Sequence, residues 1–228
     1  MDSNPQTQKA QPAGAPANAP RRRLFGGVAG GVLVAVPAKT ALGAVCKSPS
    51  AMISGNTSPR TGDGSTCSGG LSPGFWMTPQ HSPHWTVAGA KFPTFKSVPV
   101  LCGAKPPDLS ETDILTPGTL LTEAGFVGAP AGIGLWQALA YETKYTQLLR
   151  HLSAAWLNAG YFDSQSQNYP LSRPQIVEMW MAVKNGGTYC PSALLSCGNN
   201  GWTASDVIAY ISGMYDVQAA VPNLCKGT

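Results

Sequence analysis

Residues 135–159 read LWQALAYETKYTQLLRHLSAAWLNA, and this stretch decides the fold class. Its apolar side chains recur at spacings of three and four residues, which predicts one amphipathic helix with a wide apolar stripe. Gly160 follows and is expected to end the helix. Because such a stripe must be buried against other elements, we expect this helix to lie at the centre of the fold.

Glu142 falls inside the apolar sector of this predicted helix. A buried carboxylate requires a partner and often lies at a functional site, but a structural ion pair is the favoured interpretation here. Arg150 lies two turns away on the same helix and is expected to be out of reach. Arg173, Lys144 or a tyrosine hydroxyl are therefore the expected partners.

Two further helices are marked by their first residues. Ser172 and Gln175 form a capping box, and they predict a helix over residues 173–184. Thr203 is a helix cap for a third helix over residues 204–218. Together these patterns predict a mainly α protein with a small core of three to four helices.

The N-terminal half is much richer in residues that interrupt helices. Residues 45–130 contain 11 Gly and 11 Pro, whereas residues 131–228 contain nine Gly and four Pro. Since each Pro removes a backbone donor and restricts its predecessor, long helices are excluded before residue 130. We expect one domain over residues 45–228, with an irregular, disulfide-bonded lobe (45–130) and a helical part (131–228).

The first 44 residues have the layout of an export signal. Arg21, Arg22 and Arg23 precede a weakly apolar run at 26–36, and residues 42–44 offer a small-residue cleavage site. Paired arginines before such a run resemble a twin-arginine (Tat) signal. The alternative is an uncleaved anchor, but the apolar run is shorter than the ~20 residues that span a membrane. We expect a periplasmic, cell-surface or extracellular protein without an integral membrane segment in the mature chain.

The net charge of +4 arises in this predicted signal. Residues 1–44 hold five of the 15 Lys and Arg residues and one of the 11 Asp and Glu residues, so the remainder is neutral. A nucleic-acid-binding protein gathers its basic residues on the folded part. Nucleic acid is therefore excluded as an expected partner.

All six cysteines follow the predicted signal, which indicates disulfides formed in an oxidising compartment. No C-x2-C pair of the kind that binds zinc is present. The preferred pairing is Cys190–Cys197, because it closes a short loop. Six cysteines allow 15 connectivities, and Cys67–Cys102 with Cys46–Cys225 is one way to pair the remaining four.

Three tryptophans, Trp76, Trp85 and Trp202, fall in predicted loops. Their rings could stack on a ligand such as a glycan, or could anchor the loops to the helical core, and anchoring is the favoured interpretation. The Gly70–Gly74 stretch matches the G-x-S-x-G pattern of hydrolases. That pattern requires a backbone donor after the serine, and Pro73 has none, so Ser72 is expected in a turn.

His81 and His84 lie three residues apart and could bind zinc or copper. His151, in the central helix, is the remaining histidine. The alternative for the pair is structural: His81 makes a hydrogen bond inside the loop, and His84 and His151 are exposed.

Residues 67–85, CSGGLSPGFWMTPQHSPHW, resemble the opening of a family of secreted bacterial proteins that carry a cysteine, then [ST]-P-G-[FY]-W-K, then a histidine and a tryptophan. Residues 148–159 and 169–172 resemble later segments of that family. Met77 stands where the family usually has lysine. The resemblance implies export, a disulfide-bearing helical domain and a packed Pro-Gly-aromatic loop, but no reaction and no cofactor.

Two functions from different classes are compatible with these observations. The favoured one is a non-catalytic structural or binding module of the bacterial envelope or exterior, with an envelope protein or a glycan as partner. His81, Trp76, Trp85 and Trp202 are its candidate binding residues. The alternative is an exported metal-dependent hydrolase that uses His81 and His84.

Overall fold

The computed structural model describes residues 48–54, 69–96 and 110–215. Over these residues the fold is mainly α, as the sequence predicts, with one pair of short antiparallel strands in which Phe95 faces Ile114. The elements are α1 (Pro49–Ile53), α2 (Pro73–Met77), η1 (Pro79–His81), α3 (Ser82–Val87), β1 (Thr94–Phe95), η2 (Glu111–Asp113), β2 (Ile114–Thr116), α4 (Leu135–Ala140), α5 (Glu142–Tyr145), α6 (Gln147–Ser164), α7 (Arg173–Val183), η3 (Gly198–Asn200) and α8 (Ala204–Gly213).

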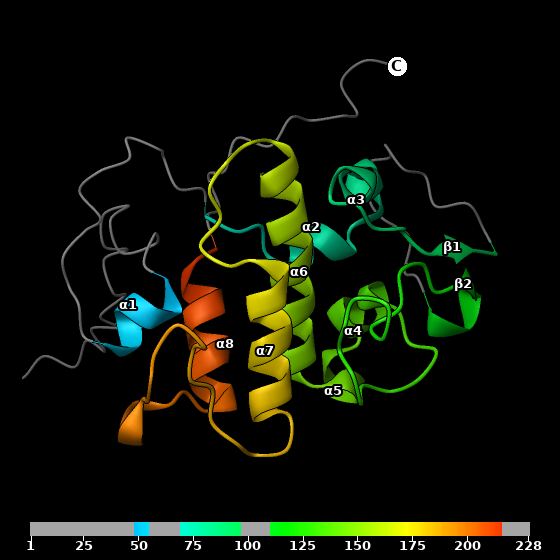
Figure 1. The fold of residues 1–228 in the computed structure, drawn as a ribbon. Coiled ribbons are helices and arrows are strands. Elements are labelled where there is room, and N and C mark those ends of the chain that lie inside the picture. Colours follow the sequence, from blue (N-terminus) through cyan, green and yellow to red (C-terminus); the bar gives the residue numbers. More distant parts are fainter. Residues whose placement is uncertain (1–47, 55–68, 97–109, 216–228) are drawn as a thin grey trace, which may run out of the picture. The chain divides into compact units, whose positions relative to one another are not determined.

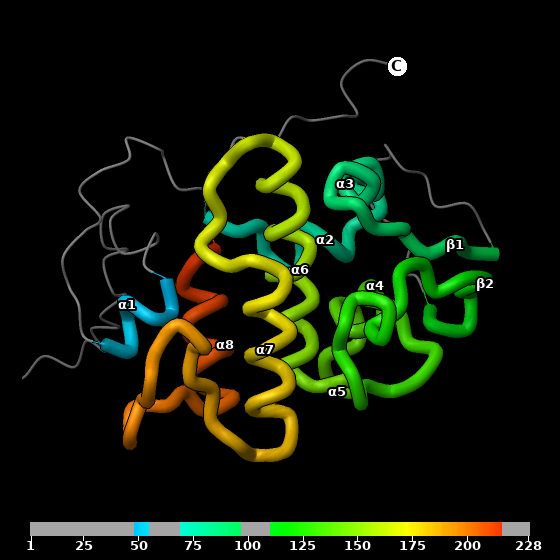
Figure 2. The backbone as a smooth tube through the Cα atoms, viewed as in Figure 1, coloured from blue at the N-terminus to red at the C-terminus, as the bar shows by residue number. Residues whose placement is uncertain are grey.

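Helix α6 is the central element. It contacts α2, α3, α4, α5, α7 and α8, and Figure 1 shows α7 and α8 running beside it. Twelve of its 18 residues are buried, so its apolar surface is covered on most sides. The chain path in Figure 2 shows the connection that leaves the C-terminal end of α6 and returns to the start of α7.

The prediction of one continuous helix over residues 135–159 is wrong, because the chain breaks twice within it. Tyr141 departs from helical geometry (φ −114°, ψ 62°) between α4 and α5. Thr146 has φ 76° and ψ 146° between α5 and α6, and its hydroxyl accepts a hydrogen bond from Leu149 N at 3.4 Å. The apolar spacing continues through both breaks, which is why periodicity alone did not reveal them.

The break at Thr146 also corrects the expected surroundings of Glu142. Arg150 Nη1 lies 2.6 Å from Glu142 Oε2, although a continuous helix would have kept the two side chains apart. The Glu142 side chain is 41% exposed, so it is not a buried carboxylate. The predicted ion pair exists, but its partner is Arg150, which a continuous helix would have kept out of reach.

Gly160 does not end the central helix, which continues to Ser164. A Cβ atom at position 160 would collide with the Ala88 carbonyl oxygen and the Arg173 guanidinium. The glycine therefore serves close approach between α6 and its neighbours rather than chain termination.

The starts of the two later helices are confirmed. Ser172 and Gln175 form the predicted capping box of α7, and Thr203 caps α8 with Asp206. Helix α8 ends at Gly213, earlier than predicted.

The Cys190–Cys197 disulfide is confirmed, with the two Cα atoms 5.7 Å apart. Cys46, Cys67, Cys102 and Cys225 lie outside the described residues, as does the predicted signal over 1–44. Among the residues that the structure describes, no helix has both the length and the apolar character needed to cross a membrane.

Candidate functional site

Ser72 acts as a helix cap. Its Oγ atom accepts a hydrogen bond from Phe75 N at 3.3 Å, and Pro73 occupies the first turn of α2. Both residue types are favoured at these positions because a serine side chain satisfies an unpaired donor and proline needs none. The G-x-S-x-G pattern thus begins a short helix.

The rings of Trp76 and Trp85 are buried, at 0% and 1% exposure. Trp85 Nε1 donates to the Trp76 carbonyl oxygen at 3.0 Å, and the two rings meet edge to face with centroids 6.2 Å apart. Neither ring presents a face to solvent. This burial favours the anchoring interpretation over ligand stacking.

Asn158 of α6, which the sequence did not single out, attaches this segment to the central helix. Its Oδ1 atom accepts hydrogen bonds from Trp76 Nε1 at 3.0 Å and from Leu71 N at 2.9 Å. Its Nδ2 atom donates to the Leu71 carbonyl oxygen at 3.0 Å. An amide fits here because it offers both an acceptor and a donor within the core.

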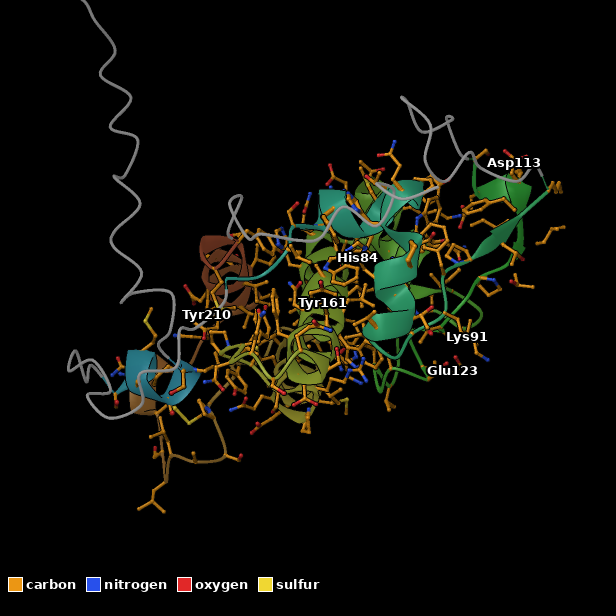
Figure 3. The ribbon with its side chains drawn as sticks, turned by 90° about the horizontal axis from the view of Figure 1, so that it is seen from above. His84, Lys91, Asp113, Glu123, Tyr161 and Tyr210 are labelled. Carbon is orange, nitrogen blue, oxygen red and sulfur yellow. A yellow bond between two sulfur atoms is a disulfide. The ribbon has the colours of Figure 1, made fainter. Side chains whose placement is uncertain are left out.

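His81 and His84 lie together in an aromatic cluster. The His81 ring stacks on Phe75 with centroids 3.7 Å apart, and the His84 ring lies 5.5 Å from that of His81. In Figure 3, His84 of α3 lies beside Tyr161 of α6, with ring centroids 5.6 Å apart. Partial burial, together with the nearby His84, lowers the pKa of His81 to about 4. His81 is therefore neutral at physiological pH.

The structure corrects the expected exposure of two histidines. His84 is 1% exposed. His151 is partly buried, and its Nδ1 atom lies 2.8 Å from the Tyr215 hydroxyl. Within the described ranges, the His81–His84 pair is not joined by a third His, Cys, Asp or Glu that could complete a metal site.

Trp202 is partly exposed, unlike the other two candidate tryptophans. Its ring packs against Tyr210 with centroids 4.8 Å apart, and its backbone exchanges two hydrogen bonds with Tyr189. These contacts hold the segment that carries the Cys190–Cys197 disulfide. Trp202 thus lies in a different part of the fold from the α2–α3 segment, and the structure does not bring the four candidate residues into one site.

Glu111 organises a polar cluster that sequence analysis missed. Its carboxylate accepts hydrogen bonds from Gln137, Lys144 and Tyr145, which link η2 to α4 and α5. The bond from Lys144 is the main cause of a lowered Glu111 pKa, followed by that from Tyr145. The cluster holds the β1–β2 region against the helices.

A cleft of about 340 Å³ opens where the end of α6, the connection over residues 165–172 and the start of α7 meet. Polar groups of Asp163, Asn168 and Arg173 line it, together with Tyr169. Nothing in the sequence marked this cleft, because its residues become neighbours only when α7 folds back along α6. In this segment the sequence indicates only the Ser172 cap and the family resemblance of residues 169–172.

Arg173 is fixed in the wall of the cleft. Its Cζ atom lies 3.4 Å from the centre of the Trp156 ring. Its Nη2 atom donates to the Ala88 carbonyl oxygen, and its Nε atom donates to the Trp156 carbonyl oxygen at 3.4 Å. Burial lowers the Arg173 pKa, and the negative charge of Asp163 partly offsets this effect.

The Arg173 guanidinium is not neutralised by an ion pair within the described residues. No carboxylate oxygen of the described residues lies within 4.0 Å of it. Its third nitrogen, Nη1, has no hydrogen-bond acceptor in the described part of the chain. Arg173 thus places a fixed positive charge in the lining of the cleft, and such a guanidinium is suited to bind a carboxylate.

Comparison with family models, with curated proteins and with solved structures finds no match to this chain.

Proposed function

We propose that this chain is an exported, non-catalytic binding module whose ligand site is the α6–α7 cleft. The observation that carries the proposal is the cleft of about 340 Å³, with the fixed Arg173 guanidinium in its wall. Small-molecule sites are concave, largely preformed and lined by apolar surface with a few oriented polar groups. The cleft is concave, and its lining combines apolar surface from Ala159 and Leu171 with the polar residues Asp163, Asn168 and Arg173.

The burial of Trp76 and Trp85 supports the same proposal. Both rings are committed to packing, and their indole donors are satisfied by Asn158 and by the Trp76 carbonyl oxygen. We therefore assign the Pro-Gly-aromatic segment to the scaffold and ligand binding to the cleft. Export rests on the paired arginines and the apolar run of residues 1–44.

A ligand panel tests the proposal. Thermal melts of the purified chain are recorded with sugars, amino acids, nucleotides and short peptides, each as a separate class. A ligand that binds the folded state raises the melting temperature. Asn168→Trp, which fills the cleft from an exposed position, should abolish the shift, whereas Asn199→Trp on the exposed η3 should not. No shift from any class, or a shift that survives Asn168→Trp, contradicts the proposal.

A metal-dependent hydrolase remains the second candidate function, because the His81 and His84 rings are neighbours, with centroids 5.5 Å apart in an edge-to-face arrangement. Zinc or copper bound there would use the ring nitrogens of both residues. Elemental analysis of the purified chain separates the two functions. Stoichiometric metal that is lost in His81→Phe would favour the hydrolase.

A further inference from the structure

We infer that the α6–α7 cleft binds a saccharide unit that carries a carboxylate, such as a uronic acid residue of a polysaccharide. The inference rests on the proposed binding function and names its ligand class. Three properties of the cleft lead to it: the mixture of its polar groups, its apolar wall and the placement of its two charges.

The polar groups match the hydroxyls of a sugar. The Asp163 carboxylate offers acceptors only, the Arg173 guanidinium offers donors only, and the Asn168 amide offers both. A sugar hydroxyl both donates and accepts, so it can be satisfied by neighbours of either kind. Asp163 and Asn168 are exposed, and their side chains can meet a ligand without unfolding the site.

The apolar wall matches the C–H face of a sugar ring. Tyr169, Leu171 and Ala159 contribute to the lining. The Tyr169 ring is held in place by stacking on Phe162, with centroids 5.8 Å apart and planes 19° apart. A cleft of about 340 Å³ lies near the lower end of the usual range for small-molecule sites, roughly 300–1,000 Å³, which suits one or two sugar rings.

The charges orient the ligand. Arg173 has no carboxylate partner within 4.0 Å among the described residues, and its Nη1 atom is unused. A ligand carboxylate would be attracted to this side of the cleft and repelled by Asp163. The carboxylate is therefore placed at Arg173, and the ring hydroxyls are placed at Asp163 and Asn168.

The test measures binding to the purified full chain by titration calorimetry, with three probes. These are trigalacturonate, the neutral trisaccharide maltotriose, and sodium acetate. We expect trigalacturonate to bind about tenfold more tightly than maltotriose, the difference expected from one charge-assisted hydrogen bond. Acetate should show no measurable binding. Equal affinity for the two trisaccharides, or acetate binding as tightly as trigalacturonate, overturns the inference.

Variants connect the binding to the cleft. Asn168→Ala should weaken trigalacturonate binding by about tenfold, and the exposed amide change Asn199→Ala should leave it unchanged. Arg173→Met, which removes the positive charge, should remove the preference for the charged trisaccharide while the melt confirms that the chain is folded. Unaltered binding in Asn168→Ala, or an unaltered preference in a folded Arg173→Met, contradicts the inference.

Failure of the inference is distinguishable from failure of the proposed function. If trigalacturonate does not bind but another class of the panel does, and Asn168→Trp abolishes that binding, the function stands and the acidic saccharide is wrong. If trigalacturonate binds equally well to Asn168→Trp, the cleft is not the site, and both proposals fall.

Discussion

At the scale of single residues, Asn158 ties the segment that precedes and begins α2 to the central helix α6. Three polar groups, Leu71 N, the Leu71 carbonyl oxygen and Trp76 Nε1, are bonded to this one side chain. Asn158 and Trp76 are both 0% exposed, so water is excluded from these groups. Each buried polar group left without a partner costs about 1–3 kcal/mol.

Replacing Asn158 should therefore destabilise the protein strongly. We expect Asn158→Ala to lower the free energy of unfolding by about 3–5 kcal/mol, since it leaves three buried groups without partners. Denaturant unfolding monitored by tryptophan fluorescence measures the change. Asn199→Ala, at an exposed amide, should stay within about 0.5 kcal/mol of the wild type. A similarly small effect of Asn158→Ala would show that the aromatic segment is not anchored in this way.

His81 should make stability depend on pH. Its pKa falls from 6.5 to about 4 on folding, mainly because burial disfavours the charged ring. Between these values the unfolded chain holds a proton that the folded chain does not hold. The free energy of unfolding should therefore fall as the pH is lowered from 6.5 to about 4, and this contribution should not change further below that range.

The variant His81→Phe isolates this effect, because it preserves an aromatic ring against Phe75 but cannot titrate. Between pH 4 and 6.5 we expect the free energy of unfolding of His81→Phe to change by about 1 kcal/mol less than that of the wild type. The difference is small because solvent reaches the half-buried ring and screens its charge. Urea midpoints at a series of pH values give the comparison. His151 is present in both proteins and cancels. Identical pH profiles would refute the assignment.

At the scale of elements, the break before α6 places Thr146 in a strained conformation. Its φ of 76° with ψ of 146° lies in a region that is normally confined to glycine. The same break allows two stabilising interactions: the Thr146 hydroxyl caps α6, and Arg150 pairs with Glu142. Such strain costs about 1–3 kcal/mol, whereas a helix cap contributes about 1 kcal/mol.

Thr146→Gly should accordingly stabilise the protein. Glycine removes the strain, and as a helix cap it costs only a few tenths of a kcal/mol, so we expect a net gain of about 1 kcal/mol in thermal or denaturant unfolding. Thr146→Ala is the matched control. It retains the strain and loses the cap, and it should destabilise by about 1 kcal/mol. Destabilisation by glycine would mean that the cap outweighs the strain.

Local features of the helices could be predicted from the sequence, whereas contacts between distant segments could not. Ser172 and Thr203 identified two helix starts, because capping is a local interaction between residues three apart. The end at Gly160 was misread, since its glycine serves a contact with Ala88 and Arg173 from distant segments. The cleft was missed for the same reason: Asp163 and Arg173 acquire a common role only through the fold.

At the scale of the whole molecule, the distribution of charge separates two parts of the chain. Residues 45–228 carry equal numbers of basic and acidic side chains, and the net charge of +4 comes from residues 1–44. A part of the chain without net charge exerts little long-range electrostatic attraction, so the binding proposed above rests on local contacts. The cleft carries one charge of each sign, Asp163 and Arg173, so the carboxylate inferred above would be placed by its local contact with Arg173.

The last prediction concerns the N-terminal segment: export of the protein depends on the paired arginines of residues 21–23. The Tat route reads these arginines ahead of a weakly apolar run, and Arg21, Arg22 and Arg23 have that position. Changing all three to lysine preserves the positive charge but removes the guanidinium groups. The precursor should then remain in the cytoplasm, as cell fractionation and immunoblotting would show.

Lys9→Gln, which changes charge outside the motif, should be exported normally. Normal export of the lysine variant, or of the wild type in cells without the Tat machinery, would exclude this route.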